Sequence, residues 1–191
     1  SSAVLTGKIG TQDSNGNDST ADFRSVLLGA KTRLTHKVQG GAGLGWYGRD
    51  SGGDSISIAA FDLGLAWSAT PKVVVQASAN NTVEPATQDR DNYRTVSKMS
   101  AAGTWRISDR FSTSLLVSSV QNDYEKDVIL SDGSGAKKKD DAISGALRVT
   151  YAPPAKFLTA FADVTYEAKN STFETDDYDQ VVVSLGGSIT Y

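Results

Sequence analysis

The chain has no cysteine, one histidine and four prolines, and it contains no long run of apolar residues. Without cysteine, the chain forms no disulfides and no thiolate metal sites. A membrane-spanning helix needs about 20 consecutive apolar residues, and no stretch approaches that length, so a helical membrane protein is excluded. A transmembrane β-barrel is not excluded, because each strand needs only about 9–11 residues and half of these can be polar.

The overall charge and length narrow the class further. The net charge of -3 is too small to indicate a nucleic acid or an acidic membrane surface as partner, so we expect no nucleic-acid binding. We interpret residues 1–191 as a single domain, large enough for a small barrel. The first residues lack the basic start and apolar stretch of a signal peptide, so an exported protein would be represented by its mature chain or a part of it.

The clearest pattern lies in the last stretch, DQVVVSLGGSITY, where apolar and polar residues alternate. This period of two indicates a β-strand with one apolar and one polar face. Ten segments share the pattern: residues 2–10, 23–34, 38–47, 57–68, 73–79, 93–106, 111–117, 143–151, 158–166 and 179–191. The connections alternate between long acidic loops, the longest at 121–141, and the short turns THK, ATPK, SDR and APPA.

This layout predicts an all-β fold, a transmembrane antiparallel up-and-down β-barrel of about ten strands with long extracellular loops and short periplasmic turns. A soluble β-sandwich or lipocalin-like barrel is the alternative. A second alternative within the membrane class is that the chain forms the C-terminal portion of a longer barrel.

Away from the strand ends, the charged residues of the predicted strands occupy only the polar side. The expected lumen-lining charges are Lys8, Lys31, Arg33, Asp62, Arg94, Lys98, Arg106, Arg148 and Asp163, with a net charge of +5. Exclusion of charge from the other side is expected for a lipid-facing surface, although the inner face of a soluble sandwich would also exclude it.

Aromatic residues favour the membrane interpretation. The predicted girdles contain Trp46, Tyr93 and Tyr166 at the strand ends beside long loops, and Trp67, Trp105, Phe111, Tyr151 and Tyr191 at the ends beside short turns. All eight lie on the apolar side, whereas Phe61 alone lies mid-strand. Two aromatic belts are typical of the two membrane interfaces, while a soluble core would place large aromatics mid-strand.

Two stretches resemble a known family. They are DNYRTVSKMSAAGTWRISDRFSTSLLVSSVQNDYE, a strand, a short turn and a returning strand, and the ending DYDQVVVSLGGSITY. They resemble the porin-type β-barrels associated with exopolysaccharide export in Gram-negative bacteria, most of which are longer than this chain. The resemblance implies a location in the Gram-negative outer membrane and a transport function.

No enzyme, cofactor or metal site is expected. The single histidine, His36, lies in the short turn THK, away from the long loops where a barrel protease would need it. The segment DSNGND begins like a calcium loop but has its glycine at the wrong position and Arg24 where the closing glutamate belongs.

The function we expect is a porin-like passive conduit for hydrophilic solutes or polysaccharide. The alternative is a non-conducting barrel that anchors, or binds a partner or ligand, through its acidic loops, with the interior charges paired in a plugged lumen. Gly41, Gly43 and Gly45 leave one strand without inward bulk, either to admit a solute or to let the wall bend. Expected partners are outer-membrane lipid and lipopolysaccharide, the barrel-assembly machinery through the C-terminal strand, and either another protein or further copies of the chain.

Overall fold

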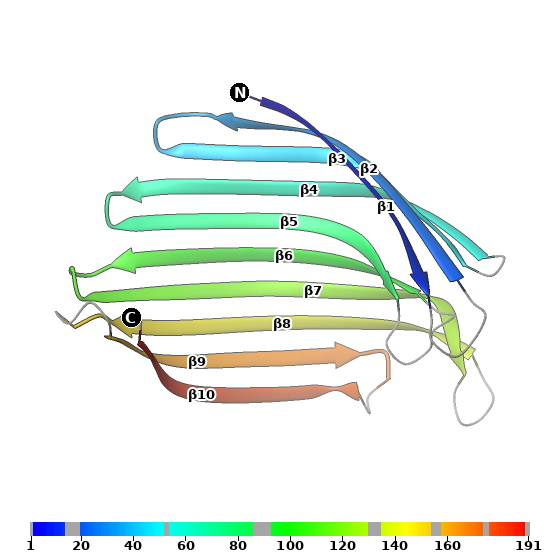
Figure 1. Cartoon of the computed structure of the whole chain (residues 1–191). Helices are drawn as coiled ribbons and strands as arrows, with labels where there is room; N and C mark the ends of the chain where they lie inside the picture. The colour runs from blue at the N-terminus through cyan, green and yellow to red at the C-terminus, as the bar shows by residue number, and fades with distance from the viewer. Residues whose placement is uncertain are drawn as a thin grey trace.

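The computed structural model describes residues 2–13, 20–51, 54–85, 93–129, 135–153, 158–173 and 176–189. These residues form one antiparallel sheet of ten strands in chain order (Figure 1). The strands are β1 (Ser2–Asp13), β2 (Thr20–Arg33), β3 (Val38–Ser51), β4 (Asp54–Thr70), β5 (Val73–Pro85), β6 (Tyr93–Arg106), β7 (Phe111–Ile129), β8 (Gly135–Tyr151), β9 (Leu158–Ser171) and β10 (Tyr178–Ile189). The described residues include no helix that is long and apolar enough to cross a membrane.

Every strand pairs with its neighbours in sequence, so the sheet is a continuous meander. Short connections join the strands at one end: residues 34–37 link β2 to β3, residues 71 and 72 link β4 to β5, and residues 107–110 link β6 to β7. The prediction of an all-β chain with ten antiparallel strands is confirmed. His36 lies exposed in the first of these turns.

The strands extend further than the alternation predicted, and the loops are correspondingly shorter. The segment 121–141 was expected to be the longest loop, but β7 continues to Ile129 and β8 already begins at Gly135. Here Asp123 pairs with Lys139, and the ladder shifts register between Asp123 and Asp127. The alternation is lost in this part because both faces carry charged residues. We infer that these strand ends extend beyond the part of the sheet that carries an apolar face, and that neither of their faces contacts lipid.

The two edges of the sheet are not joined. Within the described residues, β1 pairs only with β2 and β10 pairs only with β9. The two strands lie at opposite edges of a curved sheet in Figure 1. The predicted sheet is therefore present, whereas the pairing that would close it into a barrel is not among the ladders described.

The register gives the sheet one apolar and one polar face. We call the apolar side the outer face and the other the inner face. Large apolar residues lie exposed on the outer face: Val26, Leu28, Leu44, Leu63, Leu65, Met99, Leu115, Val117, Ile143, Leu147, Val149, Val164, Val181, Val183 and Leu185. A contiguous exposed apolar surface of this extent marks a membrane interaction site, and on a curved sheet it forms the lipid-facing belt.

One glycine in β3 has a packing reason. A Cβ atom added at Gly45 would lie 1.8 Å from the Val26 carbonyl oxygen of β2, so only glycine fits at this close approach of two backbones. Gly43 would meet only ordinary contacts. Gly45 therefore permits the close approach of the two backbones, whereas the role of Gly41 and Gly43 in admitting a solute stays a prediction.

Candidate functional site: the inner face of the sheet

The strand register places the predicted lumen charges on the inner face. Paired residues in an antiparallel ladder share a face. Successive pairs connect Lys31 to Gly41, Gly43 to Asp62, Asp62 to Asn80, and Asn80 to Lys98. The ladders place Arg33, Arg94, Arg106, Arg148 and Asp163 on the same face. The backbone of Lys8 pairs with that of Ser25. Whether these residues line a lumen stays a prediction.

A row of small residues crosses the middle of the inner face. We call it the small-residue belt, and its members pair in succession across β3 to β8: Gly41, Gly64, Ser78, Ser100, Ser118 and Ser144. The hydroxyl oxygens of Ser78 and Ser100 lie 2.8 Å apart, and those of Ser118 and Ser144 lie 2.7 Å apart. The belt therefore has little bulk and presents a hydroxyl surface.

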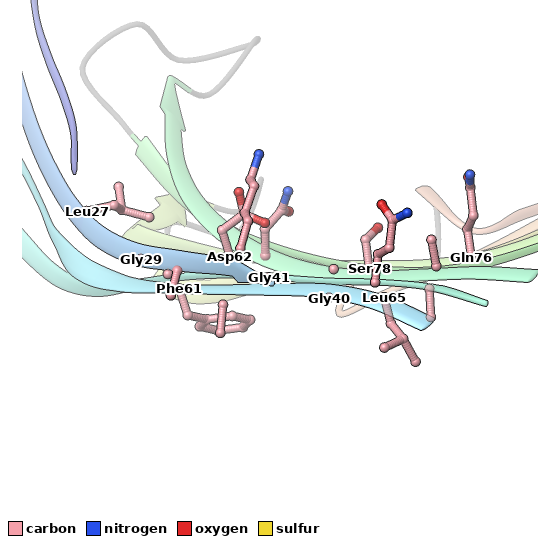
Figure 2. A pocket seen from close by; sticks show the side chains of 18 of the residues that line it. Leu27, Gly29, Gly40, Gly41, Phe61, Asp62, Leu65, Gln76 and Ser78 are labelled. Atoms are coloured by element: carbon pink, nitrogen blue, oxygen red, sulfur yellow. The ribbon is translucent and has the colours of Figure 1, made fainter. Parts of the chain in front are cut away.

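A hollow of about 1260 Å³ is lined by residues of β1 to β7, among them four members of the belt, Gly41, Gly64, Ser78 and Ser100. Figure 2 shows Asp62, Gln76 and Ser78 pointing from one side of the sheet, while Phe61 and Leu65 point from the other. The inner-face residues around the hollow also include Lys31 and Arg33 at one edge. This side is thus polar and open, with cations beside it.

The inner charges are only partly paired. Arg148 forms an ion pair with Asp163, and its guanidinium lies 4.6 Å from the centre of the Phe161 ring. Within the part of the chain that the structure describes, no ion pair involves Lys31, Arg33 or Arg106.

A second ion cluster lies where β5 ends and β6 begins. Glu84 accepts hydrogen bonds from Arg94 at 3.3 Å and from Lys98 at 3.1 Å. Arg94 also lies 3.5 Å from the Tyr124 hydroxyl. Sequence reasoning placed Glu84 in a loop and missed it. Its separation of ten residues from Arg94 across a predicted hairpin was the signal that could have identified the pair.

A third set of charges, the rim cluster, connects the long-loop ends of β7, β8 and β9. Its buried centre is Asp140, 2% exposed. The Asp140 carboxylate accepts hydrogen bonds from the Tyr124 hydroxyl at 3.3 Å and the Ser171 hydroxyl at 2.7 Å. It also lies 3.1 Å from the Lys169 ammonium and 3.9 Å from Lys138. A buried carboxylate is tolerated here because each oxygen has polar partners.

Lys138 links this carboxylate to Asp176, with which it forms a second ion pair. Burial acts to lower the pKa of Lys138, but the hydrogen bond to Asp176 and the two nearby negative charges outweigh it and raise that pKa. The same hydrogen bond lowers the pKa of Asp176. Both groups therefore stay charged around neutral pH, and the cluster fastens the strand ends together.

The predicted aromatic girdle residues lie in two different environments. Trp46, Trp67, Trp105, Phe111 and Tyr166 are exposed on the outer face. Tyr151 packs on Phe111, with ring centres 4.7 Å apart. Tyr93 is only 6% exposed and lies inside, instead of on the exposed outer face that a girdle position requires. Tyr191 lies outside the described residues. The role of these residues at an interface stays a prediction.

The comparison with protein families settles the class. Residues 9–190 match the family described as Putative beta-barrel porin 2. The chain belongs to this family. Membership makes it a porin-type β-barrel protein, which places it in the outer membrane of a Gram-negative bacterium, and proteins of this porin-like kind are typically not enzymes. Among curated proteins, no match is found.

Solved structures with the same fold include an outer-membrane protein and a porin. OmpT of Vibrio cholerae, folded in vitro, aligns with a TM-score of 0.54 and 13% identity over 97% of this chain and 63% of that chain. Its loop L8 deletion mutant aligns with a TM-score of 0.53 and 14% identity over 97% of this chain and 58% of that chain. The NanC porin aligns with a TM-score of 0.51 and 13% identity over 99% of this chain and 94% of that chain. The family member described here thus spans less than two thirds of the OmpT structures.

The described residues contain no group of three or more histidine, cysteine, aspartate or glutamate side chains placed to hold a metal ion. The inner face of this porin-type sheet offers a polar surface of hydroxyls, cations and a few paired carboxylates.

Proposed function

We propose that the chain is the wall of a porin-like passive conduit for hydrophilic solutes. The observation that carries the proposal is the small-residue belt. Six adjacent strands place glycine or serine at the same level of the inner face. Side chains fill the interior of small barrels, so a level without bulk is where a solute can pass.

Two further features favour a conduit for solutes and not a non-conducting, plugged barrel. Lys31, Arg33 and Arg106 lie exposed on the inner face, and an exposed lysine or arginine is well accommodated in a water-filled space. The serine hydroxyls can donate to and accept from sugars or water, which replaces part of a solute's hydration as it moves. Passage of polysaccharide, and with it a role in exopolysaccharide export, is the finer form of this proposal.

The conduit requires a closed wall. An unpaired strand edge costs several kcal/mol for each unsatisfied backbone group in lipid, so we propose that the free edges of β1 and β10 are paired in the membrane. The exposed apolar outer face would contact outer-membrane lipid and lipopolysaccharide. Recognition by the barrel-assembly machinery through the C-terminal strand belongs to the same proposal.

Liposome swelling tests the conduit directly. Vesicles that contain the refolded protein are expected to swell in an isotonic solution of a monosaccharide, and more slowly in a trisaccharide, because the small-residue belt admits solutes according to size. The swelling rate is read by light scattering. Vesicles made with the same protein left unfolded serve as control.

Insertion is measured separately, by the heat-dependent gel shift of a folded barrel. Folded, inserted protein that produces no more swelling than the control would contradict the conduit and favour the alternative, a non-conducting barrel that acts through its acidic loops.

A further inference from the structure

The long-loop ends of β5 and β6 leave the plane of the sheet. The β4 to β5 ladder covers only the pairs from Asp62 and Asn80 to the short turn, although β4 and β5 both continue beyond it. Figure 1 shows β5 bending away from β4 at this end. We call Asn81–Pro85 together with Tyr93–Ser97 the arm; its two strands stay paired with each other.

The Asn81 side chain holds the point of separation. Its amide nitrogen donates a hydrogen bond to the Ala59 carbonyl at 2.7 Å, and its amide oxygen accepts one from the Phe61 backbone at 2.7 Å. One side chain thus takes the place of two ladder bonds at this point. The backbone groups of Ala59 and Phe61 keep hydrogen-bond partners where β5 turns away.

Burial shows where the arm lies. Val83 and Tyr93 belong to the outer face by register, yet they are only 4% and 6% exposed. The guanidinium of Arg49, an inner-face residue of β3, lies 6.0 Å from the centre of the Tyr93 ring. In addition, β3 contacts β5, which is not its neighbour in the sheet. An outer-face ring can meet an inner-face residue of β3 only if the arm lies across the inner face.

The burial of inner-face residues on β2 and β4 supports the same position of the arm. Ser25 of β2 and Ala60 of β4 face inward by register, and both are buried. Asn81 and Thr82 of the arm line the hollow together with four members of the small-residue belt. The arm is therefore the boundary of the hollow toward the long-loop end.

The arm carries Glu84 and Arg94, and Lys98 follows Ser97 at its base; this ion cluster has a net charge of +1. Arg94 and Lys98 both bond to the single carboxylate, and their side chains are 24% and 48% exposed. A fixed excess of cations at a narrow point raises the local concentration of anions and controls which ions pass.

We propose that the arm is the constriction of the conduit and that Arg94 and Lys98 form its selective site for anionic solutes, such as carboxylated sugars. This inference rests on the proposed conduit. It predicts that charge on the arm controls ion preference, whereas equal charge elsewhere on the inner face has a smaller effect.

The test compares reversal potentials of single channels in a planar lipid bilayer under a potassium chloride gradient. In Arg94→Gln/Lys98→Gln, the anion preference of the unmodified protein is expected to fall by more than about half. The matched control, Lys31→Gln/Arg33→Gln, removes the same charge from the inner face outside the arm and is expected to shift the potential less. Glu84→Gln, which removes the arm's only carboxylate, is expected to increase the anion preference.

The outcomes separate the two proposals. Equal shifts in the two double variants, or a larger shift in the control, would overturn the arm as the selective site while leaving the conduit intact. An unchanged reversal potential in Glu84→Gln would contradict the proposal that the arm is the selective site, even if the double variant failed to fold. A folded, inserted protein with no current would overturn the conduit and the arm together.

Discussion

Leu115→Arg is expected to lower the free energy of unfolding from a lipid bilayer by about 2–4 kcal/mol, because an arginine facing lipid near the midplane carries that cost. Leu115 lies on the outer face and is 52% exposed. Its neighbour Leu116 has the opposite orientation and is 43% exposed, beside the hollow. Leu116→Arg is therefore the matched control, with the same residue type, the same strand and a similar exposure.

Reversible urea unfolding in lipid vesicles measures both variants, with tryptophan fluorescence as the signal. We expect Leu116→Arg to lose about 1 kcal/mol or less, since its guanidinium would lie in a polar, water-accessible space. Equal losses of stability in the two variants would contradict the assignment of the outer face to lipid and the inner face to water. A greater loss in Leu116→Arg would reverse the assignment of the faces.

Asp140→Ala is expected to destabilise the protein by about 3 kcal/mol, because removal of one partner from a buried ion pair leaves the other charge uncompensated. Lys169 would lose its partner at 3.1 Å, and the Tyr124 and Ser171 hydroxyls would lose their acceptor. Loosening should be greatest at the long-loop ends of β8 and β9, which the rim cluster fastens together.

Asp123→Ala provides the control, since Asp123 pairs with Lys139 at 3.1 Å but both side chains are well exposed. An exposed pair contributes about 1 kcal/mol or less. Urea unfolding gives the overall loss, and hydrogen exchange followed by mass spectrometry locates it. If both variants lost the same stability, or if exchange at the ends of β8 and β9 did not change, the rim cluster would not be a structural fastener.

The sequence predicted the strand number and the two faces because lipid imposes a strict rule on each residue. Where β4 or β7 crosses the apolar belt, every second side chain must be apolar, and this leaves a period of two that can be read directly. Eight of the nine predicted inner charges share one face by register for the same reason, and the side chain of Lys8 lies outside the described part of the structure. Strand ends beyond the belt escaped prediction since Lys137, Lys138 and Lys139 follow one another without alternation.

Parts of the candidate site could not be predicted because they depend on contacts between strands distant in sequence. Tyr93 has the parity of a girdle residue, but its environment is decided by the Asn81 side chain, which turns the arm inward. Glu84 looked like a loop residue because Pro85 follows it, and Pro usually ends a strand. The pairing of the sheet edges is likewise not encoded in alternation, which is the same for an edge strand and an internal one.

Cysteine substitution on adjacent residues of β5 tests the central claim, that the inner face lines a water-filled conduit. The chain has no native cysteine, so Ser78→Cys and Ala79→Cys each introduce a single thiol. Ser78 belongs to the small-residue belt, whereas Ala79 pairs with Leu63 and Met99 on the outer face. A charged methanethiosulfonate reagent added to single channels in a planar bilayer should reduce the current stepwise in Ser78→Cys and leave Ala79→Cys unchanged. Current that falls equally in both variants, or only in Ala79→Cys, would contradict the account.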